Sequence, residues 1–267
     1  MLLLPNVGLS AAAIAKLAQW QAEVDSQLNY PAQVEAAKAK FKQQNTRQNG
    51  TFQAVKVALT SMCSGARRCV YCEDSVADEV EHMAPKDLYP DKVFGWGNYV
   101  YACGPCNGPK NNKFGVIDAA GALVDVTRKP RGPVVPPLVG LPALINPRVD
   151  NPSNFFDLDL LGTFVLDVKE HLLASDFVRA EFTRDVLDLN RDVLLKARAN
   201  AYGSYRARLF EYRQKRNGHA SAEELAALVA GLKAMPHPTV FSEMKRLHAA
   251  IPDLSPIFGS VPEALQW

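Results

Sequence analysis

Long hydrophobic runs are missing from this chain of 267 residues. No apolar stretch approaches the roughly 18 residues that a membrane-spanning helix needs. The first ten residues, MLLLPNVGLS, contain four apolar residues followed by Pro5, and no basic segment precedes them. A secretory signal peptide has a basic start and an apolar segment of about 7 to 15 residues. We therefore expect a cytoplasmic protein that has no contact with a membrane.

Cysteine is scarce, with five residues in the chain. In a cytoplasmic protein these residues are expected to be thiols or metal ligands, because disulfides form mainly in oxidising compartments. Internal repeats are absent, and only the proline-rich stretch RKPRGPVVPPLVGLP approaches low complexity. The content of 48% hydrophobic and 22% charged residues is ordinary for a globular protein, so the composition excludes a disordered chain.

Charge of one sign is concentrated in separate segments, although the net charge is only +2. Residues 36–72 contain seven basic residues and no acid, and residues 191–216 contain eight basic residues and two acids. Between these segments, residues 73–91 contain seven acids and one base. Basic flanks suit a phosphate backbone, and an acidic centre suits a metal cation. Solvated helix faces are the alternative interpretation of the same charges.

Helical periodicity is clearest at the two ends of the chain. Ser10 is a suitable cap for a first helix, Pro31 suits the first turn of a second helix ending near Gln44, and a third helix should stop at Gly65. Asn190 is the expected cap of a long arginine-rich helix that ends near Gly218. The other expected elements are a short helix after Cys106, a hairpin in 115–126, alternating strands in 156–168, and helices over 221–234 and 238–250.

Two CxxC pairs, separated by 30 residues, are the strongest chemical signal. Each pair delivers two thiolates from one turn, and Zn2+ prefers four tetrahedral ligands. The spacing therefore predicts one closed structural zinc site, and a redox pair is the alternative. The remaining cysteine, Cys63, is expected to be a small buried apolar residue. The four predicted zinc ligands are Cys69, Cys72, Cys103 and Cys106.

A zinc site formed in this way would close the intervening segment into a loop that contains the Glu81-His82 pair. The alternation in SVADEVEHM predicts a strand whose end places Glu81 and His82 on opposite faces, and Pro85 then turns the chain away. Asn98 precedes an apolar run into the second CxxC pair. Asn107 lies four residues before Asn111, so a helix would place both on one face.

These motifs together resemble the HNH endonuclease superfamily, in particular its zinc-binding variant that ends in Asn. About 46 residues carry the pattern, and the joint specificity of its elements is high. A weaker resemblance to bacterial HNH proteins extends over most of the chain through INPRVDNP and LNRDVLLKAR. Some proteins of that group are nuclease partners of ATPases in anti-phage defence systems of the Septu or retron kind. The elements of the pattern are CVYC, EHMAP, WGNYVYAC and CGPCNGPK.

The resemblance implies an α+β fold in which a ββα-metal HNH core with a four-cysteine zinc site lies between helical regions. It divides the chain into an N-terminal helical region (1–66), the nuclease core (67–116), an insertion of strands and loops (117–176) and a C-terminal helical region (177–267).

The resemblance also implies roles for single residues. His82 would be the general base that acts on water, and an imidazole with a pKa near 6.5 suits that task. Glu81 and Asn107 would hold one catalytic cation, and Asn98 would brace the loop that carries His82. The family often has Asp at the position of Glu81 and His at the position of Asn107. A carboxylate and an amide oxygen favour Mg2+ or Mn2+ over zinc.

The expected activity is hydrolysis of DNA phosphodiester bonds, and RNA stays open as a substrate because the phosphate chemistry is shared. Paired cuts would need a homodimer or two binding events, and the resemblance suggests an ATPase or another defence-system subunit as a partner. A non-catalytic zinc module that binds nucleic acid or a partner is the alternative. The residues expected to contact nucleic acid are Lys110, Arg67, Arg68 and Lys86.

Overall fold

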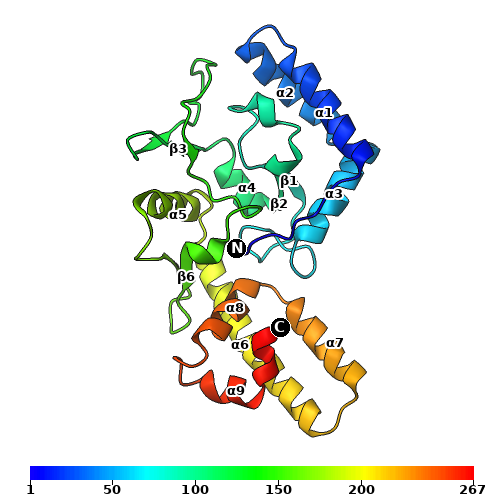
Figure 1. Cartoon of the computed structure of the whole chain (residues 1–267), viewed down its shortest axis with the longest axis vertical. Coiled ribbons are helices and arrows are strands. Elements are labelled where there is room, and N and C mark those ends of the chain that lie inside the picture. Colours follow the sequence, from blue (N-terminus) through cyan, green and yellow to red (C-terminus); the bar gives the residue numbers. More distant parts are fainter.

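The computed structural model describes residues 1–267 as a mixture of α-helices and small sheets. Figure 1 shows α1 to α3 along one side of a central hairpin, and α6 to α9 at the other end of the molecule. The helices are α1 (Ala11–Asp25), α2 (Tyr30–Gln44), α3 (Gly50–Met62), α4 (Gly104–Lys110), α5 (Ala174–Val186), α6 (Asp192–Asn217), α7 (Ala222–Lys233), α8 (Pro238–Leu247) and α9 (Ser255–Ser260).

The strands are short and form three separate antiparallel sheets. The first sheet pairs β1 with β2, the second has the order β4-β3-β5, and the third pairs β6 with β7. The strands are β1 (Glu79–His82), β2 (Tyr99–Ala102), β3 (Gly115–Ile117), β4 (Leu123–Asp125), β5 (Leu141–Pro142), β6 (Phe156–Leu158) and β7 (Leu166–Val168).

The N-terminal helices begin where the sequence predicted. The Ser10 side chain accepts a hydrogen bond from the Ala13 amide at the start of α1, and Asn29 caps α2, which has Pro31 in its first turn. The helix α3 ends at Met62, three residues before the predicted stop at Gly65. Gly65 has a φ of +49°, and a Cβ there would overlap the Ala234 carbonyl oxygen. Glycine is therefore favoured at this position, because any side chain would be strained by the positive φ and would clash with Ala234.

Two hydrophobic cores meet at the β1–β2 hairpin. The N-terminal core joins buried residues of α1, α2 and α3 to Val80, Tyr99 and Tyr101 of the hairpin. The larger central core contains Val100 and Ala102 from the other face of β2, together with residues of α5, α6 and α8. Because side chains alternate along a strand, the hairpin has one face on each core. The predicted regions 67–116, 117–176 and 177–267 all contribute to the central core.

The predicted hairpin over 115–126 is confirmed as β3–β4, and the alternating strands predicted over 156–168 are confirmed as the pair β6–β7. The predicted cap of the long helix is wrong, because Arg191 occupies the cap of α6 and Asn190 instead bonds the Leu166 backbone. The short helix α4 begins before Cys106 rather than after it. None of the helices is both long and apolar enough to cross a membrane.

Candidate active site

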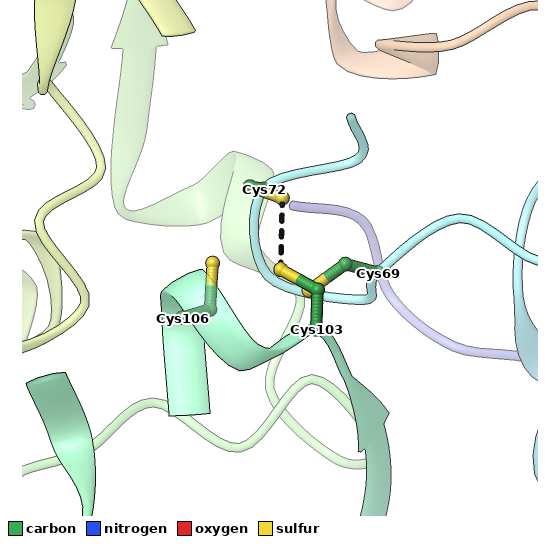
Figure 2. A group of neighbouring side chains, drawn as sticks. All are labelled: Cys69, Cys72, Cys103 and Cys106. Carbon is green, nitrogen blue, oxygen red and sulfur yellow. Dashed lines mark hydrogen bonds between the residues drawn. The ribbon is translucent and has the colours of Figure 1, made fainter. Parts of the chain in front are cut away.

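The four predicted zinc ligands form one buried cluster, whose sulfur atoms all lie within 4.8 Å of one another. Figure 2 shows Cys69 and Cys72 on one loop, Cys103 at the end of β2 and Cys106 in α4. The Cys72 and Cys103 sulfurs are 3.8 Å apart and form no disulfide. A tetrahedron with Zn–S bonds of about 2.3 Å has edges of about 3.8 Å. The donor set and its spacing fit a zinc ion, as the sequence predicted.

An arginine from the C-terminal region contacts this cluster. Arg191, at the start of α6, donates a hydrogen bond of 3.5 Å to the Cys106 sulfur. A zinc ion held by four thiolates carries a net negative charge, so a guanidinium beside it offsets part of that charge. Arg191 belongs to a basic segment and to the LNRDVLLKAR motif, and neither feature predicts a contact with the cysteines. Arg191 and Cys106 are 85 positions apart, so no local sequence pattern could predict their contact.

A cavity of about 240 Å³ lies next to the cluster, between β1 and α4. Its lining brings together residues from the strand, from the turn after it and from the helix. Of the lining residues with reactive or polar side chains, Glu79 was not singled out from the sequence. The six lining residues that bear on the chemistry are Glu79, Glu81, His82, Lys86, Asn107 and Asn111.

His82 is 3% exposed and lies at the end of β1. Its ring packs edge-on against Phe41 of α2 and Tyr99 of β2, with centroids 4.5 Å and 5.2 Å away. The Nε2 atom is 3.0 Å from the Val93 carbonyl oxygen, which can only accept a hydrogen bond. Nε2 therefore carries the proton, and Nδ1 keeps its lone pair. Burial, with the nearby Lys86 ammonium, lowers the pKa of His82 to about 3.

Glu81 lies on the opposite face of β1 and is 5% exposed. Its Oε1 forms a salt bridge with the Lys110 ammonium, which is fully buried and also donates a 2.9 Å hydrogen bond to the His82 carbonyl oxygen. Burial raises the pKa of Glu81, while the Lys110 charge opposes that rise. The expectation that Lys110 contacts a phosphate does not fit this geometry, because its ammonium is enclosed against Glu81.

Asn107 meets a carboxylate that the sequence analysis missed. Its Nδ2 donates a 2.6 Å hydrogen bond to Oε2 of Glu79, two positions before Glu81 on the same face of β1. A carboxylate only accepts hydrogen bonds, so the amide nitrogen must face Glu79 and the Oδ1 atom points away from it. Side chains two positions apart on a strand lie on the same face, so the sequence could have predicted that Glu79 lies beside Glu81.

Asn98 makes contacts that hold the turn after His82. Its Oδ1 accepts a 2.7 Å hydrogen bond from the Ala84 amide, and its Nδ2 donates to the carbonyl oxygens of Ala84 and Lys92 at 2.9 Å and 3.0 Å. These are contacts of the kind that the bracing role requires. Both Oδ1 and Nδ2 of Asn98 therefore form hydrogen bonds with the backbone.

The three other residues expected to contact nucleic acid differ in their surroundings. Lys86 lines the cavity, and its ammonium lies 5.3 Å from the Phe41 ring centroid. Arg67 is exposed and lies over the Tyr101 ring. Arg68 donates a 2.6 Å hydrogen bond to the Asp74 carbonyl oxygen within the first cysteine loop. Arg68 therefore has a structural contact that the sequence did not predict.

Comparison with known proteins reveals a partial similarity to a protein of a defence system. Septu protein PtuB of Bacillus thuringiensis is 31% identical to this chain over 142 residues. The match covers 51% of this chain and 41% of that protein, so it spans about two fifths of the relative's length. No protein-family model matches the chain.

Proposed function

We propose that this protein is a metal-dependent endonuclease of the HNH type that hydrolyses phosphodiester bonds in DNA. The observation that carries the proposal is the cavity where Glu81 and His82 from β1 meet Asn107 from α4, beside the four-cysteine cluster. A buried imidazole, a buried carboxylate and an amide oxygen are the groups that a cation-assisted hydrolysis needs. The strand-strand-helix order of β1, β2 and α4 supports the same proposal.

A role in anti-phage defence is the second part of the proposal. It is supported by the similarity to a protein named for the Septu system. An ATPase or another defence-system subunit would be the partner that activates or targets the nuclease. The similarity covers 51% of this chain and 41% of the relative, so both the defence role and the partner are proposals.

Glu81 and Asn107 are the proposed ligands of one catalytic Mg2+ or Mn2+. Lys110 contacts Oε1 of Glu81, which leaves Oε2 for a cation, and the hydrogen bond to Glu79 leaves Oδ1 of Asn107. Both atoms are hard oxygen donors, which these cations prefer. When bound, the cation would neutralise charge on the phosphate oxygens and stabilise the departing 3′ oxygen.

His82 is the proposed general base. Its Nδ1 would take a proton from a water molecule, the water oxygen would bond to phosphorus, and the bond from phosphorus to the 3′ oxygen would break. The departing oxygen takes its proton from solvent. A pKa of about 3 keeps the imidazole neutral at pH 7, so the lone pair is available. A bound phosphate anion raises the pKa of a nearby imidazole, which brings His82 closer to a useful basicity.

Zinc in the four-cysteine cluster would have a structural role. It would fix the loop of Cys69 and Cys72 to the end of β2 and the start of α4, the two elements that frame the cavity. Four thiolates leave no open position for a water molecule or a substrate, so chemistry at the zinc is not proposed.

The test is plasmid cleavage by the zinc-loaded protein with Mg2+ or Mn2+, compared with His82→Ala and with no added divalent cation. We expect nicking by the wild type and a loss of about 10²- to 10⁴-fold in His82→Ala. His171→Ala is the matched control, because His171 is exposed and outside the site. Circular dichroism and zinc content must be unchanged in each variant.

Cleavage by His82→Ala at the wild-type rate would exclude His82 as the base. No cleavage by the zinc-loaded wild type, even with its ATPase partner added, combined with DNA binding, would favour the alternative of a non-catalytic zinc module. Cleavage only after the partner is added would support the activated nuclease.

A further inference from the structure

A second polar cavity lies on the other side of the hairpin from the candidate active site. It measures about 560 Å³ and lies between α3, the loop after α2 and the hairpin. Lys56 lines it from α3, Arg47 from the loop, Arg67 from the turn before the first cysteine, and Tyr101 from β2. We call this cavity, with its three cationic side chains Arg47, Lys56 and Arg67, the basic cleft.

The three cations of the basic cleft have no carboxylate within 4.0 Å, unlike the lysine and arginine partners in the ion pairs of the protein. Burial and the Arg47 charge both lower the pKa of Lys56, with burial the larger cause. Like charges that converge without a counterion repel one another, and an anion relieves that repulsion. Asp78 is the single acid in the lining.

The cleft is held in shape by contacts that leave the cations free. Gln53 on α3 donates a 2.9 Å hydrogen bond to the Arg47 carbonyl oxygen, which ties the loop to the helix. The Arg67 guanidinium lies 5.8 Å from the Tyr101 ring centroid, a cation–π contact that orients it without consuming its hydrogen-bond donors. Lys56 and Gln53 are three positions apart on α3, so both face the cleft.

We propose that the basic cleft binds the phosphate group of a nucleotide, at a site separate from the candidate active site. Two guanidiniums and an ammonium supply the donors that phosphate oxygens accept. Asp78 is exposed at the rim and accepts hydrogen bonds, which suits the sugar hydroxyl or base amine of a nucleotide rather than a bare phosphate.

The nucleotide could come from two sources with the same chemistry, a nucleic-acid strand or a free nucleotide. A strand held here would run past the hairpin to the candidate active site on its other face, which deepens the proposed function and rests on it. A free nucleotide would make the cleft a sensor site, independent of cleavage.

The experiment compares the zinc-loaded wild type with the double variant Arg47→Gln/Lys56→Gln, without divalent cation, so that cleavage plays no part. The probes are a fluorescein-labelled single-stranded DNA of twelve nucleotides, followed by anisotropy over a series of salt concentrations, and ADP, followed by calorimetry. Lys42→Gln is the matched control, since Lys42 is an exposed cation on α2 outside the cleft.

We expect the double variant to bind its probe about tenfold more weakly, and we expect its salt dependence for the strand to fall by about 1.4 in log–log slope. Loss of strand binding alone assigns the strand as the source, and loss of ADP binding assigns the free nucleotide. Equal affinities in the wild type and the double variant would overturn the proposal. An equal loss in Lys42→Gln would also overturn it, because diffuse charge would then explain the binding. Both binding measurements are made without divalent cation, so they test the basic cleft even if the protein does not cleave plasmid DNA.

Discussion

Lys110→Met is the most informative substitution, because it removes the one cation that contacts the Glu81 carboxylate. The ammonium is fully buried, and Glu81 is 5% exposed, so water does not replace the lost charge. Breaking a buried pair by removing one partner costs about 3 to 5 kcal/mol, since the remaining charge is uncompensated. Glu81 can avoid that cost only by taking up a proton.

Proton uptake by Glu81 determines how much stability Lys110→Met loses and how that loss varies with pH. Burial already raises the pKa of Glu81 from its usual value near 4.5, and loss of Lys110 removes the largest opposing influence. A carboxyl group whose folded pKa is raised contributes stability below its unfolded pKa and loses it as the pH rises through the folded pKa. Keeping Glu81 protonated costs about 2 kcal/mol at pH 6 and about 3.5 kcal/mol at pH 7.

Urea denaturation of the zinc-loaded protein between pH 6 and pH 8 measures this effect. Because the pKa of Glu81 is raised further in Lys110→Met, we expect the free energy of unfolding of this variant to fall with pH more steeply than that of the wild type, by at most about 1.4 kcal/mol per pH unit, until the variant's Glu81 ionises. Glu81→Gln/Lys110→Met should recover much of the loss and be flat with pH. Lys113→Met is the control, since Lys113 is exposed three positions further on. A loss under about 1 kcal/mol at pH 7 would refute the buried pair.

Further substitutions test the zinc site and the scaffold. We expect native mass spectrometry to find one zinc ion per chain in the wild type and none in Cys106→Ser, because three thiolates no longer close the site. Arg191→Gln should keep zinc but bind it about 10- to 100-fold more weakly in a chelator competition. Asn98→Ala should lower kcat with little change in KM, because the turn after His82 loses its hydrogen bonds, and the converse pattern would argue for a substrate contact. Gly65→Ala should lower the free energy of unfolding by about 2 kcal/mol or more, visible as a fall in Tm, because both its φ and the Ala234 carbonyl oppose a side chain.

Features set by local chemistry could be predicted from the sequence. Ser10 and Pro31 act within one helical turn, and the hairpin over 115–126 closes within a few residues. The four cysteines could be assigned to one cluster because a metal with four soft ligands leaves few other uses for two CxxC pairs. Period-two alternation likewise predicted that Glu81 and His82 leave the strand on opposite faces.

Features set by distant partners could not be predicted in this way. Asn190 had the right residue type for a cap, but the Leu166 backbone, 24 positions earlier, takes its side chain. Lys110 was expected to contact nucleic acid, and its burial depends on how α4 packs against β1. Such pairings follow from the tertiary arrangement, on which single-sequence patterns carry little information.

The position of the hairpin between two cores explains how one short strand can supply two chemically different groups. The face toward the N-terminal core places His82 against Phe41 and Tyr99, where the loss of water keeps the imidazole neutral. The face toward α4 places Glu81 beside Lys110, where a fixed charge favours the carboxylate. A slip of one residue in the register with β2 would exchange these environments and leave a carboxylate among aromatic rings. The paired register is therefore part of the chemistry of the site, and α2 contributes to it through Phe41, which fixes the His82 ring from one side.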